Sequence, residues 1–301
     1  MTGKHSSVQR RQTLKAYGFM TPALIIIILF TIIPIIGSLV LMFYDYSVLG
    51  QTKFVGLKNF VKAFHDRVFW ISIKNSVIFV VVVPIIQILS ILLAVLVNKK
   101  LPGIGIFRTL FYIPVVTSMV AVSIMWGFIF DTSGIINTAL KEWKVISMPL
   151  GFLSDKNTAM ICLMFITIWQ GLGYYMMMYL AGLQGIPQEL CEAATIDGAN
   201  KVQQFGKITM PLLKGITKTN ITFWSVHTTT FFLWSKMFSP VDTEASTIVP
   251  VVYLYDTVFG GKGNANRDAG AGAAVGVILA LIIVVVYFVM NRLLKDDDLE
   301  F

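Results

Sequence analysis

Charged residues are scarce in this 301-residue sequence, where Asp, Glu, Lys and Arg together make up only 13% of the chain. An average soluble domain is about one quarter charged, so a soluble fold would lack the polar surface that it needs. Cysteine and histidine are rarer still, with two and three copies. The two cysteines do not predict a structural disulfide, and His5, His65 and His227 are too scattered in the sequence to predict a metal site.

Long apolar segments are what the chain has in abundance, since 56% of its residues are hydrophobic. Six stretches contain no charged residue: 19–43, 75–98, 109–130, 157–188, 219–235 and 269–291. An α-helix crosses the hydrocarbon core with about 20 residues, and lipid offers unpaired backbone groups no partner. A buried helical core of a large soluble protein is the alternative, but the first and last stretches are apolar on every face. The sequence therefore predicts an all-α polytopic membrane protein with six transmembrane helices.

The expected membrane helices cover residues 17–43, 74–97, 107–130, 157–183, 214–238 and 269–294, within a single transmembrane domain over residues 1–301. The fifth is rich in Asn, Thr, Ser and His, so we expect it to face protein or water rather than lipid. A short amphipathic helix is expected between the first two, lying in the membrane interface. Its apolar residues follow helical spacing: Leu57, Phe60, Val61 and Phe64.

The basic residues of the N-terminal segment and of the loop 98–108 predict how the chain is oriented in the membrane. Neither segment contains an acidic residue, and short loops rich in Lys and Arg stay in the cytoplasm. Six spans then place both termini in the cytoplasm. A cleaved signal peptide is the alternative for the N-terminus, but the apolar run from Ala23 to Phe43 is too long and lacks a cleavage site. The net charge of +8 suits anchoring beside a membrane and gives no reason to expect a nucleic-acid partner.

A polar segment, residues 184–213, separates the fourth and fifth expected membrane helices. Pro187 suits the first turn of a helix, and Glu192 follows early in it, where the helix dipole favours negative charge. Gly198 fits the left-handed position that ends a helix, and a second short helix is expected to begin near Asn200. The segment is thus predicted to form two short helices that project from the membrane.

The residues of this segment also form a spaced motif: Glu-Ala-Ala, three residues, Gly, nine residues, and Ile-x-Met-Pro. Its members are Glu192, Ala193, Ala194, Gly198, Ile208 and Pro211. The motif resembles the cytoplasmic loop of the membrane subunits of binding-protein-dependent ATP-binding cassette (ABC) importers, with Met210 in place of the usual Leu. The resemblance implies a type I importer permease fold in which a coupling helix, including Asp197, docks into an ATPase subunit.

The resemblance extends along the chain and narrows to the carbohydrate-uptake branch of these permeases. The segments that carry it are Pro22-Ala23-Leu24 in the first helix, residues 54–60 (Phe-Val-Gly-Leu-Lys-Asn-Phe) and Phe111-Tyr112-Ile113-Pro114. The loop 239–268 departs from the branch because it lacks the Gly-Gly-Pro turn that is frequent there. The fit of this loop to a binding protein is therefore left open.

What the resemblance implies is import of a sugar or oligosaccharide into a bacterial or archaeal cell across the cytoplasmic membrane. The partners would be an extracytoplasmic solute-binding protein, a second homologous permease subunit and two ATPase subunits. No G-x-x-x-x-G-K-[ST] loop occurs in the sequence, so ATP and Mg are expected in the partner ATPase and no cofactor in this chain. This chain is then a permease subunit rather than an enzyme.

A polar and aromatic stripe on the fifth helix provides candidate substrate contacts, because amides bind sugar hydroxyls and aromatic rings stack on apolar sugar faces. The candidates on the fifth helix are Asn220, Trp224, His227 and Phe231, and those on the fourth are Gln170, Tyr174 and Tyr175. The alternative is that these residues only pack between helices.

Two other functions remain as alternatives. An ion-coupled secondary transporter usually keeps charged residues within the membrane, and the predicted spans have His227 alone as a conventional titratable side chain in mid-span. A membrane enzyme would need a nucleophile with its base or a metal cluster, and the sequence offers neither. An ABC permease for a non-sugar solute such as glycerol phosphate also remains open.

Overall fold

The computed structural model describes residues 3–46, 52–99, 102–238, 247–261 and 267–293, and most of them are helical. Four helical stretches are long and apolar enough to cross a membrane: Gln12–Leu41, Arg67–Val97, Thr158–Gln184 and Ala269–Leu293. A fifth is present if the bent pair α6 (Ile104–Val116) and α7 (Met119–Ile129) counts as one span. The all-α membrane class predicted from the sequence is confirmed, and within the described residues length and hydropathy mark four or five of the six expected spans.

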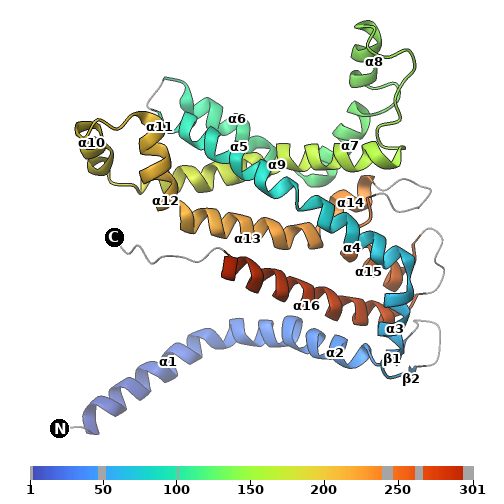
Figure 1. Ribbon diagram of the computed structural model, residues 1–301. Coiled ribbons are helices and arrows are strands. Elements are labelled where there is room, and N and C mark those ends of the chain that lie inside the picture. Colours follow the sequence, from blue (N-terminus) through green and yellow to red (C-terminus); the bar gives the residue numbers. More distant parts are fainter. Residues whose placement is uncertain (1–2, 47–51, 100–101, 239–246, 262–266, 294–301) are drawn as a thin grey trace.

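The first span begins earlier than predicted and is not a uniform α-helix. It consists of α1 (Gly3–Ile27), a π-helical turn η1 (Ile28–Ile32) and α2 (Ile33–Leu41). The π turn lies directly before Pro34, whose missing N–H cannot take part in a regular helical ladder. Figure 1 shows α1 standing apart from the other helices, while α2 packs against α16 (Ala269–Leu293).

The second span starts at Arg67 rather than Lys74 and has a break. Its halves are α4 (Arg67–Phe79) and α5 (Val82–Val97). The break at Val80 and Val81 comes one turn before Pro84, whose ring clashes with the carbonyl four residues earlier. The start is fixed by Asp66, whose carboxylate accepts a hydrogen bond of 2.7 Å from the N–H of Val68.

The third predicted helix, residues 107–130, is wrong as a single element. Helices α6 and α7 meet at an angle of 98° because Thr117 adopts an extended conformation (φ −79°, ψ 143°). The two halves have different packing partners: α6 lies against α9 (Lys156–Gln184), and α7 lies against α14 (Phe232–Phe238). The contact with α9 is close, since a Cβ on Gly173 would lie 2.0 Å from the Phe111 carbonyl oxygen.

The fifth predicted helix, residues 214–238, is also divided. Helix α13 (Lys214–Thr230) ends at Phe231, whose ψ of 60° is not helical, and α14 continues to Phe238. Consistent with its polar sequence, α13 lies inside the bundle, where it contacts α4, α5, α9 and α16. The expectation that this segment faces protein rather than lipid is confirmed for buried Asn220, Ser225 and Thr228.

Helices α5, α9, α13 and α16 run side by side and define the long axis of the bundle (Figure 1). Short elements gather at its two ends. At one end lie α10 (Gln188–Ile196), α11 (Lys201–Gln204), the π turn η2 (Phe205–Thr209) and α12 (Met210–Leu212). At the other lie β1 (Tyr44–Asp45), β2 (Lys53–Phe54), α3 (Lys58–His65) and α15 (Pro250–Phe259). Helix α8 (Ile135–Glu142) projects sideways from the bundle.

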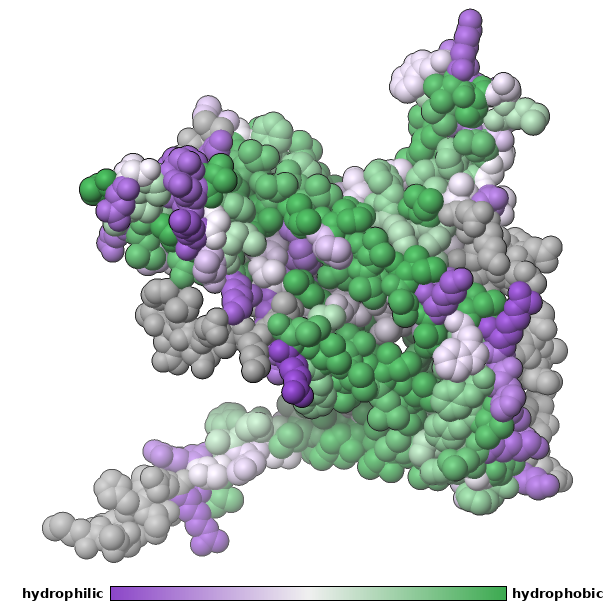
Figure 2. All heavy atoms as spheres, viewed as in Figure 1, coloured by the Kyte–Doolittle hydropathy of each residue, from purple (hydrophilic) through white to green (hydrophobic). Residues whose placement is uncertain are grey.

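The surface, like the fold, differs between the middle of the bundle and its two ends. Apolar side chains cover the middle of the bundle, and hydrophilic side chains gather over its two ends (Figure 2). Large apolar residues of the first span are exposed, including Phe30 at 76%. Because lipid rather than water suits such a surface, the exposed middle band is the part that the membrane covers.

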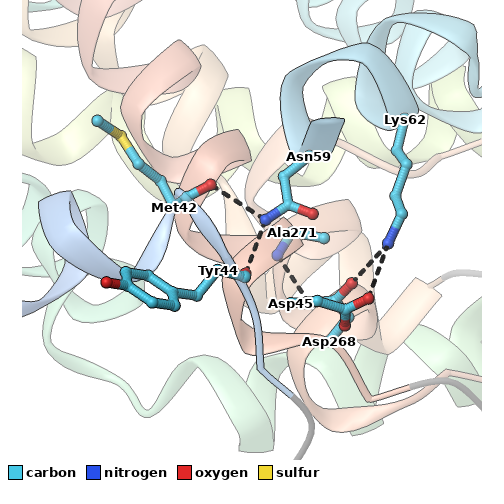
Figure 3. Close-up of polar contacts among 7 residues, drawn as sticks. All are labelled: Met42, Tyr44, Asp45, Asn59, Lys62, Asp268 and Ala271. Carbon is cyan, nitrogen blue, oxygen red and sulfur yellow. Dashed lines mark hydrogen bonds and ion pairs between the residues drawn. The ribbon is translucent and has the colours of Figure 1, made fainter. Parts of the chain in front are cut away.

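A group of polar contacts, which we call the clasp, joins the first span to α16 (Figure 3). The Asn59 side-chain amide on α3 donates hydrogen bonds to the carbonyls of Met42 (3.0 Å) and Tyr44 (2.9 Å). The Ala269 N–H donates to the Tyr46 carbonyl (2.8 Å). The predicted short helix is present as α3, which buries polar Asn59 against the protein, while the apolar Leu57 directly before it is exposed. Its place in the membrane interface stays a prediction.

The clasp is completed by Lys62 and by a glycine. The Lys62 ammonium lies 3.1 Å from the Asp268 carboxylate and 3.9 Å from that of Asp45. Gly270 allows the chains to approach, because a Cβ there would lie 1.8 Å from the Tyr44 carbonyl oxygen. The part of the loop 239–268 between residues 247 and 261 forms α15 and its flanks, and residues 239–246 and 262–266 lie outside the described residues.

Candidate functional site: a mid-span cavity and a projecting loop

A cavity of about 360 Å³ lies between α6, α7, α9, α13 and α14. Its volume falls within the range of about 300–1,000 Å³ that is typical of small-molecule sites. Gln170, which lines the cavity, is the central residue of the 29-residue helix α9. The cavity therefore lies near the middle of the membrane-covered band, where transporters commonly place their substrate.

Six of the seven predicted pathway residues line this cavity: Gln170, Tyr174, Tyr175, Trp224, His227 and Phe231. The seventh, Asn220, does not. Asn220 is fully buried one turn before Trp224 and lies near the Tyr179 hydroxyl instead. Helical periodicity put Asn220 on the same stripe, but α13 packs against α5 and α9, and the Asn220 side chain is covered there instead of lining the cavity.

The aromatic residues of the cavity form a continuous series of ring contacts. Tyr175 meets Trp224 edge to face at a centroid distance of 5.5 Å, and Trp224 stacks on His227 at 5.3 Å with only 3° between the planes. His227 in turn contacts Phe231 at 5.5 Å. Within the cavity lining, the series extends to Tyr174 on one side and to Trp234 on the other. These rings hold one another in fixed orientations, so the cavity wall is preformed.

The bend between α6 and α7 contributes directly to the cavity. Because α6 ends at Val116, the Pro114 carbonyl is available to accept a hydrogen bond from Gln170 Nε2 at 3.4 Å. Val115 and Met119, which flank the bend, also line the cavity. The bend thus turns the end of one helix into part of the wall and orients an amide at its centre.

Sequence reasoning missed several lining residues, among them Thr167, Gly171, Phe223 and Trp234. Trp234 follows Phe231 by three residues, so helical spacing could have found it had the break at Phe231 not interrupted the stripe. Gly171 carried no sequence signal. A Cβ at Gly171 would lie 2.9 Å from Ile86 Cδ1 and 3.4 Å from Trp224 Cζ3, so the absence of a side chain there sets the position of Trp224.

The projecting loop follows the sequence prediction closely. Helix α10 begins after Pro187 and ends at Ile196, Asp197 follows as its C-cap, and Gly198 takes the left-handed conformation with φ +81°. The Ala199 N–H then donates to the Ala194 carbonyl at 2.9 Å. Asn200 and Gln203 form a capping box at the start of α11.

A buried glutamine joins the two short helices of this loop. Gln204 Nε2 donates to the Thr195 hydroxyl at 2.9 Å and to the Ala199 carbonyl at 3.0 Å. The motif members Ile208 and Pro211 lie farther along, in η2 and α12. The loop is therefore one folded unit rather than a flexible connection.

The tip of the loop exposes both charge and apolar surface. Glu192, Ala193 and Asp197 are exposed, and so are two apolar residues that the sequence analysis did not select, Ile196 (87%) and Val202 (79%). Apolar side chains so exposed beside polar ones are typical of a surface that binds another protein. Ile196 lies on α10 and Val202 on α11. These helices form one end of the bundle (Figure 1), where hydrophilic side chains gather (Figure 2), and this favours a protein partner over lipid.

The bent bundle, its mid-span cavity and the projecting helical loop define a multi-pass permease component of an importer. Residues 60–296 match the family of binding-protein-dependent transport system inner membrane components, and the chain belongs to this family. Members are non-catalytic membrane subunits of ABC transporters, and the fold is the type I importer permease fold.

Particular relatives are similar over nearly their whole length. The lactose transport system permease protein LacF of Rhizobium radiobacter is 34% identical over 266 residues, which are 86% of this chain and 88% of LacF. The probable starch degradation products transport system permease protein AmyD of Thermoanaerobacterium thermosulfurigenes is 31% identical over 285 residues, or 94% of each chain. Among solved structures, a chain of a bacterial ABC transporter that imports the acidic polysaccharide alginate superposes with a TM-score of 0.81. The superposition covers 96% of this chain and 97% of that chain, at 22% identity.

Proposed function

We propose that this chain forms half of the transmembrane pathway of an ATP-driven importer for a sugar or oligosaccharide. The observation that carries the proposal is the mid-span cavity, which combines the Gln170 amide and two tyrosines with a series of ordered rings. The permease relatives named for lactose and for starch degradation products support carbohydrate as the cargo. The other half of the pathway would come from a second homologous permease subunit, and an extracytoplasmic binding protein would deliver the sugar.

The α10 loop is proposed to transmit the energy of ATP hydrolysis. In this arrangement its end of the bundle faces the cytoplasm, and two separate ATPase subunits bind ATP and Mg. Glu192, Ala193, Ala194, Asp197 and Gly198 would enter a cleft of one ATPase subunit, with Ile208 and Pro211 supporting the loop from behind. Ile196 would add an apolar contact, since it is exposed at the tip.

Reconstitution of the complete complex in proteoliposomes tests this function. With the binding protein outside and ATP inside, we expect uptake of a neutral oligosaccharide that stops with a non-hydrolysable ATP analogue and continues in the presence of a proton uncoupler. Uptake that stops with the uncoupler while ATP remains high would instead support an ion-coupled transporter.

A variant of the cavity tests where the sugar passes. Trp224→Ala should lower uptake at least about tenfold, because aromatic anchors in desolvated pockets dominate binding, while ATPase assembly stays intact. Trp126→Ala is the matched control, since Trp126 is partly buried against Phe130 and Trp169 and is not part of the cavity lining. Equal uptake by the two variants would place the pathway elsewhere.

A further inference from the structure

The cavity lining contains no charged side chain among the residues that the structure describes: it has no carboxylate, ammonium or guanidinium group. Its polar side-chain groups are the Gln170 amide, the hydroxyls of Thr167, Tyr174 and Tyr175, the imidazole of His227 and the indole N–H groups of Trp224 and Trp234. All of these donate or accept hydrogen bonds, as sugar hydroxyls do. None except a protonated imidazole could neutralise a charged ligand, and that imidazole is stacked flat on Trp224.

The charged residues that lie nearest along the cavity-lining helices are outside the cavity or already paired. On α13, Lys218 precedes Phe223, the nearest lining residue, by five residues, or about 7.5 Å of helix, and it lines a separate pocket. On α14, Lys236 forms an ion pair with Asp256 and lies 5.3 Å from the centre of the Tyr255 ring. An ionised ligand in the cavity would therefore lose its hydration without gaining a counter-charge, which is strongly unfavourable.

We infer that the cavity selects neutral, polyhydroxylated ligands with a flat apolar face and rejects anionic ones such as uronates, sugar phosphates and glycerol phosphate. The inference rests on the proposed role of the cavity as the sugar pathway and specifies the class of sugar. The stacked pair Trp224 and His227 provides the surface on which the apolar sugar face lies, and Gln170 is the central hydrogen-bonding group. The likeness to an importer of an acidic polysaccharide, at 22% identity, is one of fold and carries no statement about the cargo of this chain.

Charge selectivity can be measured without knowing the natural sugar. Met119 lines the cavity and is 40% exposed, so Met119→Cys provides a thiol there, in a chain whose Cys162 and Cys191 are replaced by alanine. The probes are three methanethiosulfonates that carry a neutral glucosyl, an anionic sulfonatoethyl or a cationic trimethylammonium group. Met148→Cys is the matched control, since Met148 is 76% exposed and lies outside the cavity.

We expect the glucosyl reagent to modify Met119→Cys at least about tenfold faster than either charged reagent, relative to the same ratios at Met148→Cys. Gln170→Lys, added to Met119→Cys, should raise the rate of the anionic reagent several-fold, and Gln170→Met should not. Equal relative rates for all three reagents at Met119→Cys would overturn the inference, and so would an unchanged anionic rate in a folded Gln170→Lys variant.

The same experiment separates this inference from the proposed function. If the complex imports no sugar but the thiol still reacts selectively with the neutral reagent, the transport proposal fails and the selectivity stands. If sugar uptake is normal but the thiol reacts equally with all three reagents, the selectivity fails and the transport proposal stands.

Discussion

Gly198 ends α10 in a conformation that only glycine adopts without strain. Its φ is +81°, and a Cβ there would meet no atom within 4 Å, so backbone strain rather than crowding opposes substitution. Gly198→Ala should destabilise the α10 turn by roughly 1–2 kcal/mol. Gly206→Ala is the control, because Gly206 is equally open and has no positive φ.

Amide hydrogen exchange measures the effect of these two variants. In Gly198→Ala, the Ala199 N–H that bonds to Ala194 should exchange about 5–30 times faster, the factor that corresponds to one or two kcal/mol. Coupling of ATP hydrolysis to uptake should fall with it. If the amide protection of the two variants were the same, the conformation of Gly198 would not stabilise this turn.

Glu192 is exposed on α10 beside Ala193 and is the residue proposed to meet a basic side chain of the ATPase. Removing one member of a desolvated charge pair costs about 2–5 kcal/mol, and reversing its charge should cost more. Glu192→Lys should therefore abolish recovery of the ATPase in pull-down experiments and abolish uptake, while the chain inserts at normal levels.

Two further variants test whether the effect is specific to Glu192. Glu189→Lys changes the same charge in the first turn of the same helix and should have a much smaller effect. A complementary Arg→Glu change on the ATPase should restore part of the uptake of Glu192→Lys. Wild-type recovery of the ATPase by Glu192→Lys alone would refute the docking role.

Single residues show how far the sequence predicts the site. The stripe of Trp224, His227 and Phe231 was predictable because helical spacing determines which side chains share a face. Asn220 shares this spacing but not the cavity, because the neighbouring helices determine where a stripe is covered. Gly171 could not be recognised at all, since its contribution is the space that it leaves for Trp224.

At the scale of elements, the clasp contains two kinds of contact whose contributions to stability can be compared: the hydrogen bonds of the buried Asn59 amide and the ion pairs of the half-exposed Lys62. Asn59→Asp keeps the size of the side chain but removes the N–H donors to Met42 and Tyr44. The Met42 and Tyr44 carbonyls are partly buried, and leaving a buried polar group unpaired costs about 1–3 kcal/mol, so Asn59→Asp should lower the thermal stability of the purified protein. Lys62→Met removes only ion pairs with a half-exposed lysine, which contribute about 0–1 kcal/mol, and should change the melting temperature much less.

Thermal unfolding in detergent, followed for both variants and the wild type, checks this ranking. A larger loss of stability in Lys62→Met than in Asn59→Asp would show that the charges, not the amide, hold the clasp together.

The approximate positions of the long helices were predictable, whereas only some of their irregularities were. Apolar runs without charge marked every long helix, because the cost of burying charge in lipid applies wherever a span lies. Pro34 and Pro84 are sequence signals for two irregularities, the π turn η1 and the break between α4 and α5. The 98° bend at Thr117 had no comparable signal, since α6 and α7 are each held in place by a different partner, α9 and α14.

At the scale of the whole molecule, the proposed orientation places the α10 loop in the cytoplasm. Cys191 lies on α10 and is partly exposed, whereas Cys162 is buried within α9. A membrane-impermeant maleimide should therefore leave Cys191 unlabelled on intact cells and label it in inverted vesicles stripped of the ATPase.

Ser133→Cys provides the opposite control for this topology. Ser133 is exposed in the segment between α7 and α8, which the proposed orientation places outside the cell, so its thiol should react on intact cells. Labelling of Cys191 on intact cells would reverse the orientation and, with it, the placement of the ATPase.

The clasp also has a consequence for synthesis of the chain, because its two sides are made at different times. Its hydrogen bond between Tyr46 and Ala269 joins residues 223 positions apart, and a ribosome adds about 5–20 residues per second, so about 10–45 s of synthesis separate the two partners. Throughout that interval the first span is in the membrane without α16 beside it. The side chains of residues 12 to 40 are exposed even in the finished fold. Lipid alone can therefore solvate the first span until α16 is made. A chain released before Asp268 is made would keep its first helices but lack the clasp contacts between the first span and α16. A protease that cleaves unpacked segments would therefore cleave the truncated chain in preference to the full-length chain.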